Sequence, residues 1–123
     1  MELNEITQTI IGCAIRVHKA LGPGLLESTY EVCLVHELSK SGLKVRSQLA
    51  LPVVYDGITL DAGYRIDLLV EEMVIVELKA VESIHPIHEA QVISYLKLSG
   101  KKVGLLINFN VKMLTNGIKR LAN

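Results

Sequence analysis

The stretch YRIDLLVEEMVIVELKAV, residues 64–81, decides which fold the sequence can adopt. It holds two apolar segments, 64–70 and 73–81, that are rich in Leu, Val and Ile and have the length of β-strands. The polar pair Glu71-Glu72 between them predicts a tight connection, and strands joined in this way are antiparallel. The second segment is apolar on both faces, which is typical of a central strand.

Three charged residues interrupt these two strands. Asp67 lies in the first strand, and Glu77 and Lys79 lie in the second. Because Glu77 and Lys79 are two residues apart, they point to the same face, with Cα atoms about 6–7 Å apart. Burying a charge costs several kcal/mol unless the charge is paired or binds a metal ion. The three charges therefore need a common explanation.

The register of the two strands decides whether the two carboxylates meet. Residues directly opposite each other in an antiparallel pair share a face. A two-residue loop would place Asp67 opposite Val76, which sends Asp67 and Glu77 to opposite faces. A three-residue loop over 71–73 places Asp67 opposite Glu77. We predict the three-residue loop.

Hydrophobic periodicity predicts the remaining elements. The predicted helices cover 5–21, with Asn4 as N-cap, 26–40 and 86–98, and the further strands cover 43–53, 58–60, 103–108 and 118–121. Asp56-Gly57 predicts a hairpin turn between two of these strands. The order of helices and strands predicts one α/β domain, residues 1–123, with a mixed sheet and helices packed against it.

The composition narrows the class of protein. Thirteen basic and thirteen acidic residues cancel, which argues against a protein that coats nucleic acid through many phosphate contacts. Four Tyr, one Phe and no Trp argue against an extended base-stacking surface. No apolar run is long enough to span a bilayer, and the acidic N-terminus is unlike a secretory signal, so we expect a cytoplasmic protein.

Two carboxylates that converge form an all-oxygen site suited to Mg²⁺ or Mn²⁺. A divalent ion there would activate a water molecule and neutralise charge on a phosphate, and Lys79 would orient that water or stabilise the transition state. The alternative is a structural role, in which Asp67 and Glu77 form salt bridges with Lys79 or Arg65. The Glu-x-Lys spacing alone does not separate these two interpretations.

Two further patterns lie on the predicted helices: GLLESTY at 24–30 and QVISY at 91–95. Polar residues in and near them are three or four apart and therefore share a helix face. These residues are Glu27 and Tyr30 on the second helix, and His88, Gln91 and Tyr95 on the third. With these patterns the sequence resembles the bacterial GxxExxY proteins, which are grouped with the PD-(D/E)XK nuclease superfamily near the RecB-like exonucleases. The resemblance covers nearly the whole chain.

This resemblance implies a restriction-endonuclease-like core, a central mixed β-sheet flanked by α-helices. It implies that Asp67 and Glu77 are metal ligands and that Lys79 is the catalytic lysine. Glu27 would be an additional acidic ligand or would position the metal-bound water. The residues that would contact the substrate or support the site are Gln91, Tyr95, Tyr30 and His88.

The expected function is that of a divalent-metal-dependent nuclease that hydrolyses phosphodiester bonds of nucleic acid, with DNA favoured over RNA and RNA left open. The neutral charge and small size suggest that it gains substrate affinity from a homodimer or a partner protein. The basic pairs Lys101-Lys102 and Lys119-Arg120 would hold a nucleic-acid backbone if either bordered the site. The alternative function is a non-catalytic nucleic-acid-binding or adaptor module that keeps the fold. The charged set favours catalysis, whereas the scarcity of basic and aromatic surface favours the module.

Overall fold

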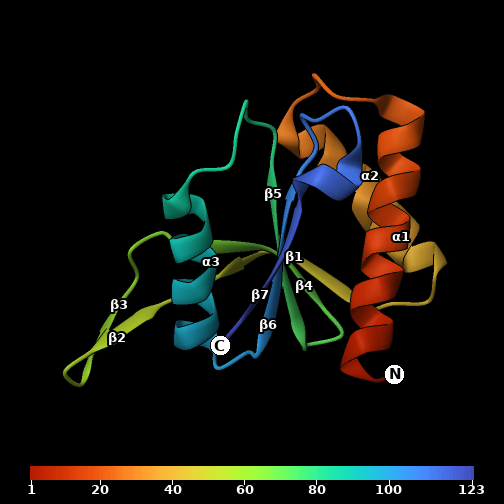
Figure 1. Ribbon diagram of the computed structural model, residues 1–123. Coiled ribbons are helices and arrows are strands. Elements are labelled where there is room, and N and C mark those ends of the chain that lie inside the picture. The colour runs from red at the N-terminus through yellow and green to blue at the C-terminus, as the bar shows by residue number, and fades with distance from the viewer.

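The chain forms a three-layer α/β domain, shown in Figure 1 as a computed structural model that describes residues 1–123. In chain order the elements are α1 (Leu3–Leu21), α2 (Glu27–Lys40), β1 (Val45–Ala50), β2 (Val53–Tyr55), β3 (Ile58–Leu60), β4 (Arg65–Val70), β5 (Val74–Lys79), α3 (Pro86–Ser99), β6 (Val103–Asn108), the short 3₁₀ turn η1 (Leu114–Gly117) and β7 (Ile118–Ala122). No helix combines the length and apolar character needed to cross a bilayer.

The central sheet has the strand order β1-β4-β5-β6-β7. β5 and β6 are parallel and are connected through α3, whereas the other neighbouring strands are antiparallel. A parallel pair needs a long crossover, and α3 supplies it. The predicted mixed sheet flanked by helices is therefore confirmed.

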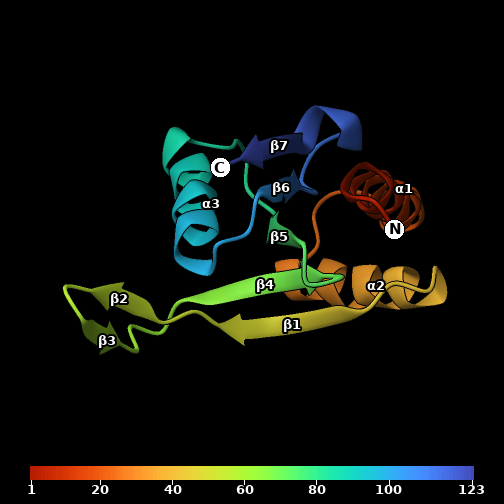
Figure 2. The ribbon, with the colours of Figure 1, turned by 90° about the horizontal axis from the view of Figure 1, so that it is seen from below.

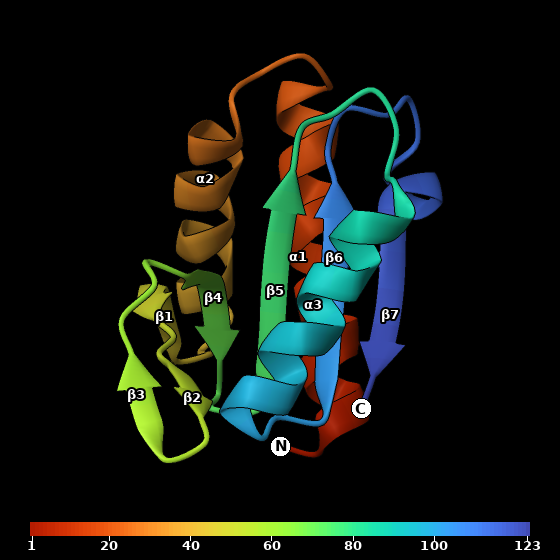
Figure 3. The same cartoon turned by 90° about the vertical axis from the view of Figure 1, so that its left-hand side faces the viewer.

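Two apolar clusters hold the layers together, one on each face of the sheet. Figures 2 and 3 show α1 and α2 on one face and α3 on the other. The larger cluster lies under α1 and α2, and its fully buried members include Ile10, Leu34, Leu68, Val76 and Leu105. The smaller lies under α3 and includes Ile66, Ile75, Val92, Leu96 and Leu106. Each such Leu, Ile or Val contributes about 1.5–3 kcal/mol through burial.

The predicted register of the β4–β5 hairpin is confirmed. Val70 pairs with Val74 and Leu68 with Val76, so the loop is the three-residue segment 71–73. Glu71 and Glu72 adopt left-handed φ values of 53° and 56°, which is uncommon for residues other than Gly. This register places Asp67 across from Glu77.

The predicted single strand over 43–53 is wrong. β1 ends at Ala50, and residues 53–55 form β2, which pairs only with β3 in a separate hairpin that turns at Asp56-Gly57. Pro52 lacks the N–H that a continuous ladder requires, so the strand breaks there. Figure 2 shows this hairpin projecting beyond the end of the main sheet.

The predicted N-cap of the first helix is also wrong. α1 begins at Leu3, with Glu2 as its N-cap. The side chain of Asn4 instead accepts a hydrogen bond from Arg120 Nη2 at 3.0 Å. A contact with β7 has replaced the local capping role, and local sequence does not indicate such a contact.

Candidate active site

The site begins where β4 and β5 stop pairing. The last regular pair is Leu68 with Val76, and beyond it side chains take over the hydrogen bonds of the ladder. The backbone N–H of Asp67 donates to Glu77 Oε1 at 3.1 Å, and the backbone N–H of Leu78 donates to Asp67 Oδ2 at 2.9 Å. We call this opening, bounded by Asp67, Glu77 and Leu78, the strand fork. The two carboxylates therefore converge as the register predicted.

Glu77 is the buried acid of the strand fork. Only 4% of its surface is exposed, and burial raises its pKa from 4.5 to about 8, with the neighbouring Asp67 charge as the second cause. The hydrogen bond from the Asp67 backbone opposes this rise in pKa. Near neutral pH the Glu77 carboxyl therefore retains a proton for much of the time when no cation is bound.

Lys79 follows two residues later on β5 and is half-buried. The four salt bridges of the structure involve other residues, so neither Lys79 nor Arg65 pairs with Asp67 or Glu77. The structural alternative considered above, in which the carboxylates serve as salt-bridge partners at the end of the sheet, is therefore not what the structure adopts. The ammonium group remains available to another anion.

Two residues that the sequence interpretation missed reach the strand fork from the side of β1 and α2. Gln48 Nε2 donates to Glu31 Oε1 at 2.7 Å and lies 3.5 Å from Asp67 Oδ1. Burial is the main reason that the pKa of Glu31 is raised, and the Asp67 charge raises it further. The β1–β4 register sets Gln48 opposite Asp67, between the pairs Ser47–Leu68 and Leu49–Ile66. Gln48 also has a left-handed φ of 52°, which no sequence motif marks.

The two residues of the GLLESTY segment lie in different surroundings. Glu27 is the exposed first residue of α2, and no hydrogen bond or ion pair joins it to the strand fork. Tyr30 is fully buried: its ring stacks on Phe109 at 4.4 Å, and its hydroxyl donates to Gly22 O at 2.6 Å and accepts from Leu25 N–H at 3.1 Å. Tyr30 therefore fixes the α1–α2 loop and has no surface with which to touch a substrate.

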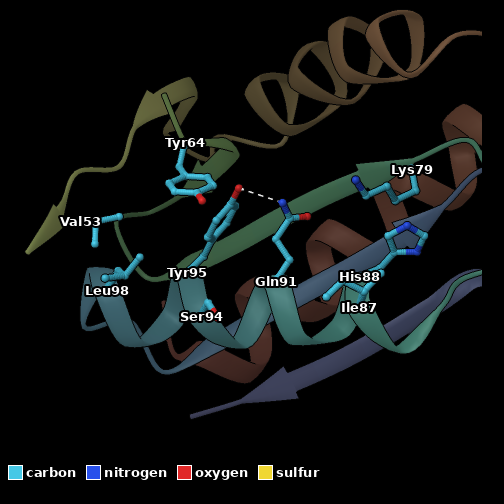
Figure 4. A pocket seen from close by; sticks show the side chains of 9 residues that line it. All are labelled: Val53, Tyr64, Lys79, Ile87, His88, Gln91, Ser94, Tyr95 and Leu98. Carbon is cyan, nitrogen blue, oxygen red and sulfur yellow. Dashed lines mark hydrogen bonds between the residues drawn. The ribbon is translucent and has the colours of Figure 1, made fainter. Parts of the chain in front are cut away.

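Lys79 lies in a groove of about 580 Å³ between β5, α3 and the segments around the hairpin (Figure 4). The nine lining residues are Val53, Tyr64, Lys79, Ile87, His88, Gln91, Ser94, Tyr95 and Leu98. The groove thus brings together four of the predicted site residues. Asp67 and Glu77 are not among its lining residues.

Tyr95 links the groove to the strand fork. Its pKa is raised, first by burial and then by the negative charges of Glu77 and Asp67. The tyrosine hydroxyl therefore stays protonated. Because it accepts a hydrogen bond from Gln91 Nε2 at 3.2 Å, its own O–H proton is left to donate elsewhere.

Asn108, which sequence interpretation also missed, fixes the chain just after Lys79. Its buried amide accepts from Val81 N–H at 3.1 Å and donates to Val81 O at 2.9 Å. The backbone N–H of Phe109 donates to Lys79 O at 2.9 Å. These bonds continue the parallel β5–β6 pairing beyond the strand ends and so hold the end of β5, with Lys79, in place.

Neither basic pair borders the groove, so the condition for their contact with a nucleic-acid backbone is not met. Lys101-Lys102 line a different cavity beside Gly100, Lys119 pairs with Glu89 at 3.1 Å, and Arg120 binds Asn4. Lys79 is therefore the one Lys or Arg that lines the groove.

The donor set of the strand fork suits a hard divalent cation. No three His, Cys, Asp or Glu side chains are arranged as a metal cluster. Asp67 and Glu77 nevertheless each use one carboxylate oxygen for a backbone N–H, and Asp67 Oδ1 has one long contact, with Gln48 Nε2. Two oxygens from neighbouring strands, one on a buried acid that forms no salt bridge, fit the preference of Mg²⁺ for carboxylates.

Comparison with known families identifies the class of protein. The family model of the PD-(D/E)XK nuclease superfamily matches residues 4–121, nearly the whole chain. The chain belongs to the PD-(D/E)XK nuclease superfamily, and its five-stranded mixed sheet flanked by helices is consistent with the restriction-endonuclease-like fold. No curated protein and no solved structure matches it significantly.

Proposed function

We propose that this protein is a divalent-metal-dependent nuclease that hydrolyses phosphodiester bonds of DNA. The observation that carries the proposal is the strand fork, where Asp67 and Glu77 converge. Lys79, two residues after Glu77, forms no salt bridge. Membership of a nuclease superfamily supports the same reaction class. A structural role alone does not account for a buried carboxylate that forms no salt bridge, although the nearby charge of Lys79 lowers its pKa.

The residues divide the work of the reaction as follows. Asp67 and Glu77 would hold Mg²⁺, or Mn²⁺ in its place, and the ion would acidify a bound water and neutralise charge on the phosphate. Lys79 places a positive charge in the groove, where it stabilises the negative charge that develops on the phosphate oxygens. Gln91 and the protonated Tyr95 hydroxyl provide neutral donors beside it.

Glu27 enters the proposal as the residue that positions water from α2. Figure 3 shows the start of α2 at the same end of the sheet as the C-terminal end of β5, which carries Lys79. His88 lines the groove through its imidazole, whose Nδ1 accepts the backbone N–H of His85 at 3.0 Å. That bond leaves Nε2 to face a ligand.

A non-catalytic nucleic-acid-binding module is the second candidate function. The observation in its favour is that Lys79 is the one Lys or Arg in the groove, so phosphate contacts alone give little affinity. A homodimer or a partner protein would supply the affinity that the chain lacks.

Cleavage of DNA and RNA in single-stranded, duplex and branched forms tests the proposal. We expect cleavage that requires Mg²⁺ or Mn²⁺ and falls about 100-fold or more in Asp67→Asn and Lys79→Ala. Lys97→Ala is the matched control, because Lys97 is exposed on α3 outside the groove, and it should cleave like the native protein. Cleavage that survives both substitutions, or native protein that cleaves no substrate, would contradict the proposal, and the second result would favour the binding module.

Binding of Mn²⁺ tests the metal site without reference to cleavage. Calorimetric titration of the native protein should give a dissociation constant that rises about tenfold or more in Glu77→Gln, because the variant removes a charged ligand and keeps its volume. Glu82→Gln, an exposed acid between β5 and α3, is the control and should bind as the native protein does. Equal affinity in Glu77→Gln would show that Glu77 is not a ligand.

A further inference from the structure

The groove has two chemically different ends. Lys79, His88 and Gln91 lie toward one end, and Figure 4 shows Val53, Tyr64 and Leu98 gathered at the other. Tyr95 lies between them, with its hydroxyl bonded to Gln91 and its ring in an edge contact with Tyr64 at 6.2 Å and 61°. One end is therefore cationic and mainly polar, with Ile87 as its one apolar side chain, and the other is apolar and aromatic.

The apolar end is not simply part of the core. Tyr64 is 45% exposed and Leu98 is 39% exposed, so both present apolar surface to solvent beside the site. No hydrogen bond holds the Tyr64 hydroxyl, and neither residue belongs to the buried cluster under α3. Only four Tyr occur in the chain, yet two of them meet in this groove.

A nucleotide, like the groove, has one charged, polar part and one flat aromatic part. Its phosphate is anionic and polar, and its base is flat with two π-faces that stack on aromatic side chains regardless of base identity. With its phosphate at Lys79, a nucleotide would direct its base along the groove, past Tyr95 toward Tyr64. Because one Lys gives few phosphate contacts, a base contact would supply affinity that charge does not.

We infer that Tyr64, Val53 and Leu98 form a subsite for one unpaired nucleobase of the bound nucleic acid. The inference rests on the proposed function, because the phosphate is placed by the proposed role of Lys79. In a duplex each base is held within the stack and cannot enter such a subsite without being flipped out. The groove volume of about 580 Å³ is large enough for a single nucleotide.

Binding in EDTA tests the subsite separately from catalysis. The probes are a fluorescent oligothymidylate and an oligonucleotide of equal length and charge in which every base is replaced by an abasic tetrahydrofuran residue. We expect the native protein to bind the base-bearing strand about tenfold more tightly, and Tyr64→Ala to weaken binding of that strand about fivefold or more without changing the abasic one. Tyr64→Phe keeps the ring and should bind like the native protein.

Tyr55→Ala is the matched control for loss of a tyrosine. Tyr55 is 72% exposed on the projecting hairpin and does not line the groove, so its removal should leave both affinities unchanged. Circular dichroism of each variant confirms that the fold is intact.

The outcomes separate the subsite from the nuclease. Equal binding of the two strands, no binding of either, or equal weakening of both by Tyr64→Ala overturns the subsite. Base-dependent binding without cleavage in Mn²⁺ would leave the subsite in place and remove the nuclease. Cleavage without base-dependent binding would support the nuclease and overturn the subsite.

Discussion

Gln48 is the residue whose backbone is most informative about the site. A φ of 52° is unfavourable for an amino acid with a β-carbon, yet Gln48 adopts it in the middle of β1. Its amide lies between Glu31 and Asp67, two carboxylates that would otherwise repel each other. Strain of this kind persists where the surrounding structure enforces it, often at functional sites.

Substitutions of Gln48 separate strain from positioning. Gln48→Gly and Gln48→Ala both remove the amide, but only Gly tolerates the left-handed backbone. The free energy of unfolding of Gln48→Ala should therefore be about 1 kcal/mol lower than that of Gln48→Gly. Urea denaturation measures this difference. Both variants should bind Mn²⁺ several-fold more weakly, because Asp67 loses its neighbour, and native-like Mn²⁺ affinity in both would count against a positioning role.

At the residue scale, the sequence predicted the charged residues of the site better than their neighbours. Asp67, Glu77 and Lys79 stand out because charge is rare inside an apolar strand, and two-residue periodicity places the last two on one face. Gln48 and Glu31 gave no signal, since both look like ordinary exposed polar residues. The β1–β4 register brings Gln48 to Asp67, and the packing of α2 against β1 brings Glu31 there.

Among the elements, the β2–β3 hairpin is the least supported. It pairs with no other strand, and most of its residues are exposed, including Val54 at 62% and Ile58 at 57%. An isolated two-stranded hairpin is only marginally stable in water. By contrast, β5 and β6 are buried along almost their whole length.

Hydrogen exchange measures this contrast directly. We expect amides of Val53–Tyr55 and Ile58–Leu60 to exchange at least about 100-fold faster than those of β5 and β6, because opening the hairpin exposes no core. Mass spectrometry of peptic fragments resolves the two regions. Comparable protection of the hairpin would indicate that another chain covers it in solution.

Helices and strands were predictable where the spacing of apolar residues and the length of the connecting loop indicated the same structure. The three-residue loop followed from the requirement that Asp67 and Glu77 share a face, although the left-handed conformation of Glu71 and Glu72 was not foreseeable from two Glu residues. The break at Pro52 was missed because the alternation of apolar residues continues through it. The alternation of apolar residues indicates which side chains share a face of a strand, whereas the strand with which it pairs depends on the arrangement of the whole sheet.

For the whole molecule, the buried acid makes stability depend on pH. Glu77 has a folded pKa of about 8, above the value of 4.5 for an unfolded chain, so the folded state binds the proton more tightly. The contribution of this group to stability is full below pH 4.5 and is lost as the pH rises through 8.

Denaturation of native protein and Glu77→Gln in EDTA tests this dependence. Between pH 4.5 and 8, the free energy of unfolding of Glu77→Gln should rise by on the order of 4 kcal/mol relative to that of the native protein, since an amide does not ionise. Excess Mn²⁺ should stabilise the native protein most at the upper end of this range, because the ion binds the ionised carboxylate. A difference between the two proteins that does not change with pH would exclude a raised Glu77 pKa.

The strand fork also affects the stability of the sheet, because it interrupts the pairing of β4 with β5. The carboxylates of Asp67 and Glu77 accept backbone N–H groups that carbonyl oxygens would otherwise accept, so β4 and β5 do not pair at these residues. Apolar residues at both positions would allow the two strands to close on each other and would bury hydrocarbon where there is now a titratable acid. Two apolar substitutions would therefore be expected to stabilise the sheet and to remove both carboxylates of the proposed metal site.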